Sequence, residues 1–329
     1  MVTTGLRHTD SPFWHNGQLF FVGPSTHNLC SYRTSDRRVF CAHIGTGFIS
    51  FAVPVHNIPH LYLVSYDKKL VFLTWNSHRN SVAPFFEIIK DAQGVPVGEN
   101  EIHEDRMSYG TIDPHGRLWF GTMNNRGPSR GSVWSYNPIF PPHLTEQFNK
   151  PNLRPHRHEG NNYSNGISWF IKIGQPTRVY YNDALSNKIQ LYFYDLINGV
   201  LENFVETIFD LNQFHQYGIN GSHCHIGRMT TDLRGWLWVP LIGGSGVLEI
   251  DPYEKQVHRF IPIPAHAVTA CAFGGVDGST LYVTTLGSGP RQRGPNADQG
   301  GEIFAVSRLG LGVFGTEARG FLSTQSAPN

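Results

Sequence analysis

The chain has 329 residues, of which 40% are apolar and 16% are charged, with 35 glycines and 21 prolines. A formal net charge of +1 provides no basic surface field, which excludes nucleic acid or an anionic membrane surface as the main partner. The composition excludes a disordered chain, no apolar run reaches the length of a membrane span, and the polar first ten residues show no signal peptide, so we expect a cytoplasmic protein.

One short pattern recurs along the chain: a turn rich in Gly, Asp, Asn or Pro, followed by a strand of apolar and aromatic residues. In chain order the predicted strands are Gly17–Val22, Pro59–Val64, Gly116–Gly121, Arg178–Asp183, Gly235–Val239 and Ser279–Thr284. Their first apolar residues lie 42 to 61 residues apart, close to the roughly 40–50 residues of a four-stranded blade plus loop insertions. A single blade cannot bury both faces of its sheet. The pattern therefore predicts one all-β domain over residues 1–329, a six-bladed β-propeller with a central funnel-shaped pocket.

Three aromatic residues and two cysteines are expected to have structural roles and not functional ones. Trp119, Trp238 and Tyr282 lie within predicted strands, and we expect them to pack in the core. Cys30 and Cys41 could pair across neighbouring strands, but free buried thiols fit an intracellular protein better.

Several segments carry more than the strand pattern. They are Asp10-Ser11-Pro12-Phe13-Trp14, Ile112–Met123, Ser164-Asn165-Gly166-Ile167-Ser168-Trp169 and Ala272-Phe273-Gly274-Gly275. Together, and in this order, they resemble the regucalcin (senescence marker protein), gluconolactonase and luciferin-regenerating-enzyme family. The resemblance implies a six-bladed propeller, in agreement with the repeats, and Leu309–Val313 is similar to the family's closing strand.

The resemblance also implies a divalent metal, usually calcium or zinc, low in the central funnel. Its ligand positions fall on Asp10, where the family has Glu, on Asn165, which is intact, and on Gly227, where the family's Asp is lost. The family's Arg-x-Asn-Asp-Gly reads Arg106-Met107-Ser108-Tyr109-Gly110 here, so the Arg is kept while the proton-accepting Asp becomes Tyr109. After Gly-Thr-Met, where the family often has acidic residues, Asn124, Asn125 and Arg126 follow.

These substitutions argue against a metal. Calcium prefers about 6–8 oxygen ligands with carboxylate charge, and the predicted site offers one carboxylate, that of Asp10. Arg106, Arg126 and Arg228 add positive charge that repels a dication. We therefore expect no metal and no other cofactor. The alternative is a rebuilt calcium or zinc site of Asp10, Asn165 and His225, since His is a good zinc ligand.

The funnel still offers groups for chemistry without a metal. Arg106, Arg228 and the Tyr109 hydroxyl are donors suited to a carbonyl or an oxyanion, and a neutral His223 or His225 is suited to proton transfer. These five are the predicted catalytic residues. The predicted substrate-binding residues are Asp10, Ser108, Asn124, Arg126, Asn165 and Asp183.

Three functions are compatible with this pattern. The first is an enzyme that dehydrates, cyclises or joins by cycloaddition an oxygenated, mostly apolar metabolite, as in specialised-metabolite biosynthesis. The second is a metal-dependent, gluconolactonase-like lactone hydrolase with altered ligands, and the third is a non-catalytic small-molecule binder. In each case the expected partner is a small molecule, and the sequence does not define the oligomeric state.

Overall fold

Tight turns divide the chain into short antiparallel strands. At the first turn, Asn16 and Gly17 have φ angles of 48° and 75°, and His15 pairs with Gln18 across them. Two successive residues with positive φ match the twist of a two-residue hairpin, and Asn-Gly adopts this conformation easily. The computed structural model describes residues 1–3, 6–67, 69–82, 86–88, 105–124, 131–137, 153–156, 164–287 and 297–322.

The described residues form five hydrogen-bonded sheets, four of which have four or five strands. The first contains β1 (Asp10–His15), β2 (Gln18–Gly23), β3 (Asn28–Arg33), β4 (Arg38–His43) and β8 (Ser81–Val82). The second contains β5 (Ala52–Pro54), β6 (Leu61–Tyr66), β7 (Lys69–Thr74) and β9 (Phe86–Ile88). The third contains β10 (Asp105–Ile112), β11 (Leu118–Asn124), β12 (Val133–Tyr136) and β13 (Leu153–His156). The fourth contains β14 (Ser164–Phe170), β15 (Thr177–Asp183), β16 (Lys188–Asp195) and β17 (Val200–Asp210).

The fifth sheet has eight strands and consists of two halves. One half contains β18 (His225–Ile226), β19 (Thr230–Thr231), β20 (Leu237–Ile242), β21 (Gly246–Asp251) and β22 (Gln256–Pro262). The other contains β23 (Ala267–Gly274), β24 (Thr280–Leu286) and β25 (Ile303–Val306). The pair Ile242–Ala267 joins the halves.

Helix is nearly absent from the described residues, which contain two 3₁₀ turns, η1 (Pro24–Thr26) and η4 (Leu211–Gln213). The prediction of an all-β chain is therefore confirmed. Within the part of the chain that the structure describes, no helix is long and apolar enough to cross a membrane.

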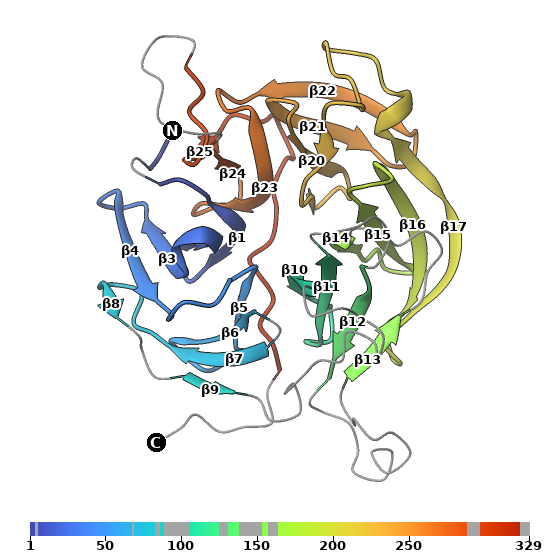
Figure 1. The fold of residues 1–329 in the computed structure, drawn as a ribbon. Coiled ribbons are helices and arrows are strands. Elements are labelled where there is room, and N and C mark those ends of the chain that lie inside the picture. The colour runs from blue at the N-terminus through green and yellow to red at the C-terminus, as the bar shows by residue number, and fades with distance from the viewer. Residues whose placement is uncertain are drawn as a thin grey trace.

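The sheets stand around a common centre (Figure 1). Each of the first four sheets and each half of the fifth forms one unit of the ring. One strand of each unit faces the centre, and these inner strands are β1, β5, β10, β14, β19 and β23. Each inner strand contacts the next, and β23 contacts β1, so the ring closes on itself. The start of the chain supports the closure, because Val2 N donates to Ile303 O at 2.8 Å.

Apolar side chains fill the space between neighbouring sheets. Each of the six apolar clusters combines residues from two adjacent units of the ring. Trp119 and Trp238 are completely buried and Tyr282 is 4% exposed, so their predicted place in the core is confirmed. Because every sheet is covered by two neighbours, its stability depends on the ring around it.

The C-terminal strap, residues 314–322, crosses the ring and passes close to its centre (Figure 1). Ala318 N donates to Trp14 O at 3.0 Å, Phe321 N to Pro54 O at 2.8 Å, and Leu322 N to Gly116 O at 3.0 Å. The strap therefore connects three sheets near the turns that end their inner strands. Leu309–Val313, which is similar to the family's closing strand, forms no strand here, because it turns toward the strap instead of pairing with β25.

The prediction of free thiols at Cys30 and Cys41 is wrong. The two residues are directly paired between β3 and β4, their Cα atoms lie 4.0 Å apart, and they form a disulfide. Cys224 and Cys271 are free and buried. Since disulfides persist mainly in oxidising compartments, the cytoplasmic location stays a prediction that this pair does not support.

We predict that Trp119→Ala lowers the free energy of unfolding by about 3–5 kcal/mol, because it opens a cavity between two sheets. The Trp119 ring stacks on His156 with centroids 4.0 Å apart and meets the edge of Tyr194 at 5.6 Å. Urea unfolding followed by circular dichroism measures the loss. The fully exposed Ile173 provides the control, since Ile173→Ala removes no packing. Equal effects of the two changes would contradict the assignment of Trp119 to the core.

Candidate functional site

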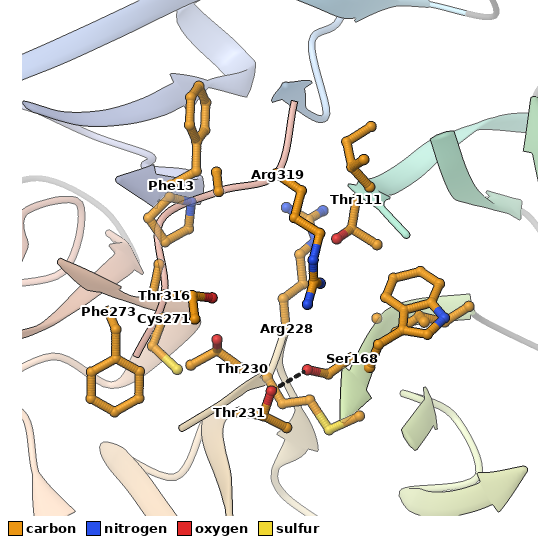
Figure 2. Close-up of a pocket in the computed structure, with 18 of the residues that line it drawn as sticks. Phe13, Thr111, Ser168, Arg228, Thr230, Thr231, Cys271, Phe273, Thr316 and Arg319 are labelled. Carbon is orange, nitrogen blue, oxygen red and sulfur yellow. Dashed lines mark hydrogen bonds between the residues drawn. The ribbon is translucent and has the colours of Figure 1, made fainter. Parts of the chain in front are cut away.

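A cavity of about 300 Å³ occupies the middle of the ring (Figure 2). Its lining runs from Ser11 and Arg228, near the starts of β1 and β19, to Trp14 and Leu233, where those inner strands end. The C-terminal strap contributes Arg319 to the lining at that second end. The cavity is therefore the central channel, with Arg228 at one end and the strap at the other.

The cavity lining combines apolar residues with hydroxyl groups. Phe13 and Trp169 are part of the lining, while their rings pack in the core between sheets, Phe13 on Phe20 with centroids 5.1 Å apart and Trp169 against Trp119 at 6.0 Å. On the polar part, Ser168 Oγ and Thr231 Oγ1 share a hydrogen bond of 2.9 Å, and Thr230 stands beside them (Figure 2). Such a mixture suits a small molecule with an apolar body and a few polar groups.

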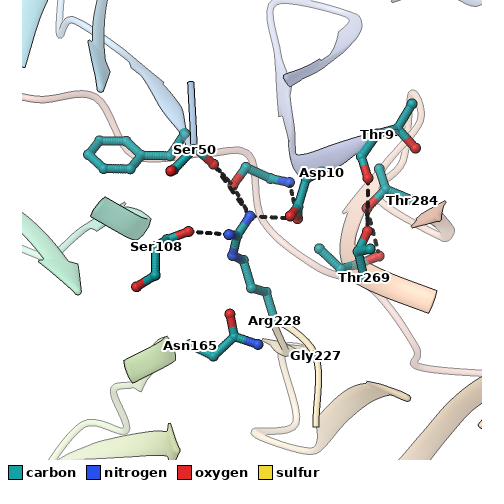
Figure 3. Close-up of polar contacts among 12 residues, drawn as sticks. Thr9, Asp10, Ser50, Ser108, Asn165, Gly227, Arg228, Thr269 and Thr284 are labelled. Atoms are coloured by element: carbon teal, nitrogen blue, oxygen red, sulfur yellow. Dashed lines mark hydrogen bonds and ion pairs between the residues drawn. The ribbon is translucent and has the colours of Figure 1, made fainter. Parts of the chain in front are cut away.

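The first end of the channel is organised by the guanidinium of Arg228 (Figure 3). Its Nη1 lies 2.5 Å from Asp10 Oδ1, and the two side chains are only 15% and 12% exposed. Nη1 also donates to Ser11 Oγ at 2.6 Å and to Ser50 O at 3.4 Å, while Nη2 donates to Ser108 O. The Arg228 cation thus sits among four oxygen atoms from three neighbouring inner-strand regions.

The chain around Gly227 is held so that Arg228 points inward. Asn165 Nδ2 donates to Ile226 O at 3.1 Å, and Asn182 Nδ2 donates to Gly227 O at 2.6 Å. The backbone here passes so close to Thr269 that a Cβ at position 227 would come within 2.5 Å of the Thr269 carbonyl oxygen. A glycine is therefore required, and a carboxylate side chain has no room at this position in the observed backbone.

These residues do not fit a divalent cation. Asp10, whose carboxylate would be needed as a ligand, is already paired with Arg228. In the described ranges, no three His, Cys, Asp or Glu side chains are grouped so that they could hold a metal. A second positive ion beside a buried guanidinium would meet strong repulsion in a site with little water.

His8 is a site residue that the sequence reasoning missed. Its Nε2 lies 3.9 Å from Asp10 Oδ2. Burial lowers the pKa of His8, Asp10 opposes this, and the charges of Arg228 and Arg106 lower it further, so the ring is neutral at pH 7. The spacing was a usable signal, because His8 and Asp10 are two residues apart in extended chain and so share a face.

Arg106 lies close to this group. Its guanidinium stacks on the ring of Phe48, with Cζ 4.0 Å from the ring centroid. Its charge, like that of Arg228, contributes to the lowered pKa of His8. Of the predicted site residues, the structure brings Arg228 and Asp10 into direct contact.

Tyr109 and Ser108 have mainly structural contacts. The Tyr109 hydroxyl is buried and accepts a hydrogen bond of 3.2 Å from Ser164 Oγ, and burial raises the Tyr109 pKa far above its ordinary value. Ser108 Oγ donates to Ser164 O at 2.5 Å, while its carbonyl accepts from Arg228. The Tyr109 hydroxyl is therefore buried between sheets, while Tyr109 also contributes to the lining of the central cavity.

The two predicted histidines do not join the group around Arg228. His223 and His225 are exposed, and His225 Nδ1 is 3.1 Å from the carbonyl oxygen of Ala184. Neither lines the central cavity. The alternative metal set of Asp10, Asn165 and His225 is therefore not assembled, because His225 turns to the β15–β16 connection.

The remaining predicted binding residues are placed as follows. Asp183 is buried and its Oδ1 accepts from the backbone N–H groups of Leu185 and Ser186, both at 3.0 Å, so it stabilises a turn. Asn124 ends β11, and the structure does not describe its side chain. Arg126 lies outside the described residues.

A sequence profile of the SMP-30/Gluconolactonase/LRE-like region matches residues 8–287. The chain belongs to this family. Regucalcin of Bos taurus is 26% identical over 311 residues, which cover 92% of this chain and 91% of that protein. "Putative sugar lactone lactonase YvrE" of Bacillus subtilis is 34% identical over 187 residues, a match that spans 56% of this chain and 56% of that protein. The solved structure of luciferin-regenerating enzyme shares the fold, with a TM-score of 0.77 at 23% identity over 97% of both chains.

The resemblance predicted from the sequence is thereby confirmed. Within the SMP-30/Gluconolactonase/LRE-like family, this chain keeps a family match on both sides of Gly227 and Arg228. The match includes Gly227 and Arg228, and the Arg228 side chain contacts Asp10, one of the residues at which the resemblance implied a metal ligand.

We predict that Arg228→Met lowers the free energy of unfolding by about 3–5 kcal/mol, because it leaves the Asp10 carboxylate buried without its partner. The double variant Asp10→Asn with Arg228→Met should lose less than the sum of the two single changes. Chemical unfolding of all four proteins measures this coupling. Lys255→Met, which breaks an ion pair with Glu206 that is exposed on both sides, is the control and should have almost no effect. Additive losses for Asp10 and Arg228 would contradict the pairing.

Proposed function

We propose that residues 1–329 form one closed six-bladed β-propeller whose central funnel holds the functional site. The support is the closed series of contacts between the inner strands and the six apolar clusters, each shared by two neighbouring units. The family match over residues 8–287 supports the same arrangement.

We propose that the chain is a small-molecule enzyme that works without a divalent metal. The observation that carries this proposal is the position of the Arg228 guanidinium among Asp10, Ser11, Ser50 and Ser108. A dication at this place would have to displace a buried cation from the carboxylate that neutralises it. That exchange costs on the order of several kcal/mol, because the displaced guanidinium is left without its partner.

The reaction that best suits the remaining groups is the loss of water from an oxygenated, mostly apolar molecule. His8 takes a proton from the carbon next to a carbonyl, and Arg106 donates hydrogen bonds to the enolate oxygen that forms. The enolate then expels the neighbouring hydroxyl, which takes the proton back from His8 and leaves as water. Asp10, 3.9 Å from His8, stabilises the protonated ring between the two steps.

The unsaturated carbonyl product of such a step is itself a reactant for ring closure or cycloaddition. A site that holds the reacting atoms together assists these reactions, because it lowers the entropic part of the barrier. The proposal therefore covers dehydration, cyclisation and cycloaddition at the Arg228 end of the channel, beside His8 and Arg106, which are not part of the lining of the central cavity.

A metal-dependent lactone hydrolase is the second candidate. The observation in its favour is the match to a family named after gluconolactonase, together with the relative from Bacillus subtilis whose name describes a sugar lactone lactonase. It requires that a metal bind in spite of Arg228.

Metal analysis and a chelator test separate the two candidates. We expect purified protein to hold far less than one equivalent of calcium or zinc, and turnover of β-hydroxy ketones to persist in EDTA. Lactone hydrolysis that stops in EDTA and returns with calcium or zinc would instead establish the hydrolase. A ligand that is retained through purification without any turnover would point to a non-catalytic binder.

We predict that His8→Ala and Arg106→Met each lower kcat/KM for the dehydration of a β-hydroxy ketone by about 100-fold. This is the usual effect of removing a proton-transfer group or an oxyanion donor. The exposed His215 provides the matched control, and His215→Ala should leave kcat/KM unchanged. Steady-state kinetics at pH 7 measures the effect, with circular dichroism to verify folding. Wild-type rates in both site variants would remove His8 and Arg106 from the mechanism.

A further inference from the structure

Arg319 is a charged residue of the channel lining that has no carboxylate partner among the described residues. The strap carries it into the lining of the central cavity, and Figure 2 shows its guanidinium near the middle, in front of Arg228. Among the described residues, no carboxylate lies within ion-pair distance of Arg319, whereas Arg228 is neutralised by Asp10. Surrounding protein lowers the Arg319 pKa, and the charge of Asp113 raises it only in part.

The nearby carboxylates are committed elsewhere. Asp113 Oδ2 is 2.6 Å from Arg117 Nε, and Asp113 is fully buried with it. Asp232 Oδ2, at the end of the cavity, is 2.6 Å from Arg234 Nη2. Glu317, on the strap, is exposed and also belongs to the cavity lining, and its charge acts on His15 at the turn after β1. Arg319 is exposed as well, and its charge, which forms no ion pair among the described residues, is available to a ligand.

We propose that the strap end of the channel is a binding site for a small organic monoanion, a carboxylate with a flat apolar body. Arg319 pairs with the carboxylate, and the hydroxyls of Thr230 and Thr231 lie on the same part of the wall (Figure 2). The partly exposed Pro12, Ala272 and Ala318 belong to the same lining and provide apolar surface for the body of the ligand. This site lies on the opposite side of Arg228 from His8 and does not depend on the reaction proposed above.

The cavity also limits the class of ligand. A volume of about 300 Å³ is at the lower end of the range for small-molecule pockets, so the ligand is a single ring or a chain of similar size. One guanidinium without a carboxylate partner, with the exposed Glu317 nearby, favours a single negative charge over the two charges of phosphate.

Calorimetric titration of the full chain with benzoate, benzamide and acetate tests this site. We expect benzoate to bind. Benzamide, which lacks the charge, and acetate, which lacks the ring, should each bind at least tenfold more weakly. Arg319→Gln should weaken benzoate at least tenfold and leave benzamide unchanged. The matched control is Arg308→Gln, because Arg308 is exposed and is not part of the cavity lining.

A second variant keeps the test independent of the strap. Thr230→Leu leaves Arg319 in place but fills part of the cavity, and it should also abolish benzoate binding. Equal benzoate affinity in wild type and Arg319→Gln would overturn the proposal, as would the absence of benzoate binding at millimolar concentration. Phosphate binding stronger than benzoate binding would overturn the assignment to an organic monoanion. These outcomes measure binding and not turnover. They can therefore contradict this binding site without contradicting the proposed reaction.

Discussion

The ion pair between Arg228 and Asp10 joins parts of the ring between which the described residues form no backbone hydrogen bonds. Arg228 enters from the loop before β19, Asp10 begins β1, and the carbonyl groups of Ser50 and Ser108 come from the regions around β5 and β10. Because the pair is largely shielded from water, each charge must be neutralised by the other. Removal of either side chain leaves an unpaired buried charge and lowers the stability of the fold strongly. The middle of the ring is therefore organised around a charge that belongs to the protein itself.

That arrangement determines which chemistry the channel supports. The chain belongs to the SMP-30/Gluconolactonase/LRE-like family, yet at position 227 the backbone lies too close to Thr269 for any side chain, and at position 228 an arginine fills the space beyond it. A guanidinium donates hydrogen bonds in fixed directions but does not exchange a bound water or substrate oxygen as a metal ion does. His8 lies beside the pair, with its Nε2 3.9 Å from Asp10 Oδ2.

The strap gives the two ends of the channel different characters. At one end the charge of Arg228 is neutralised within the protein, while at the other Arg319 enters the cavity from a segment held by backbone hydrogen bonds to Trp14, Pro54 and Gly116. A cation on a strap fixed at several points loses little further freedom when it binds an anion, so more of the electrostatic gain is retained as affinity. The channel thus combines one internally satisfied end with one that can recognise a ligand.

The spacing of strands such as Leu118–Gly121 and Leu237–Val239 determined the all-β class from sequence alone, because alternation and turn residues are local properties. The motifs around Asp10 and Asn165 likewise identified the family. The resemblance also implied that a carboxylate is missing at Gly227, but not that Arg228 would point inward and pair with a residue 218 positions away. Only the tertiary structure decided that, as it decided the Cys30–Cys41 bond, the outward position of His225 and the course of the strap to Arg319. The physical reason is that these contacts depend on how whole sheets are oriented around the channel, and no short stretch of sequence carries that information.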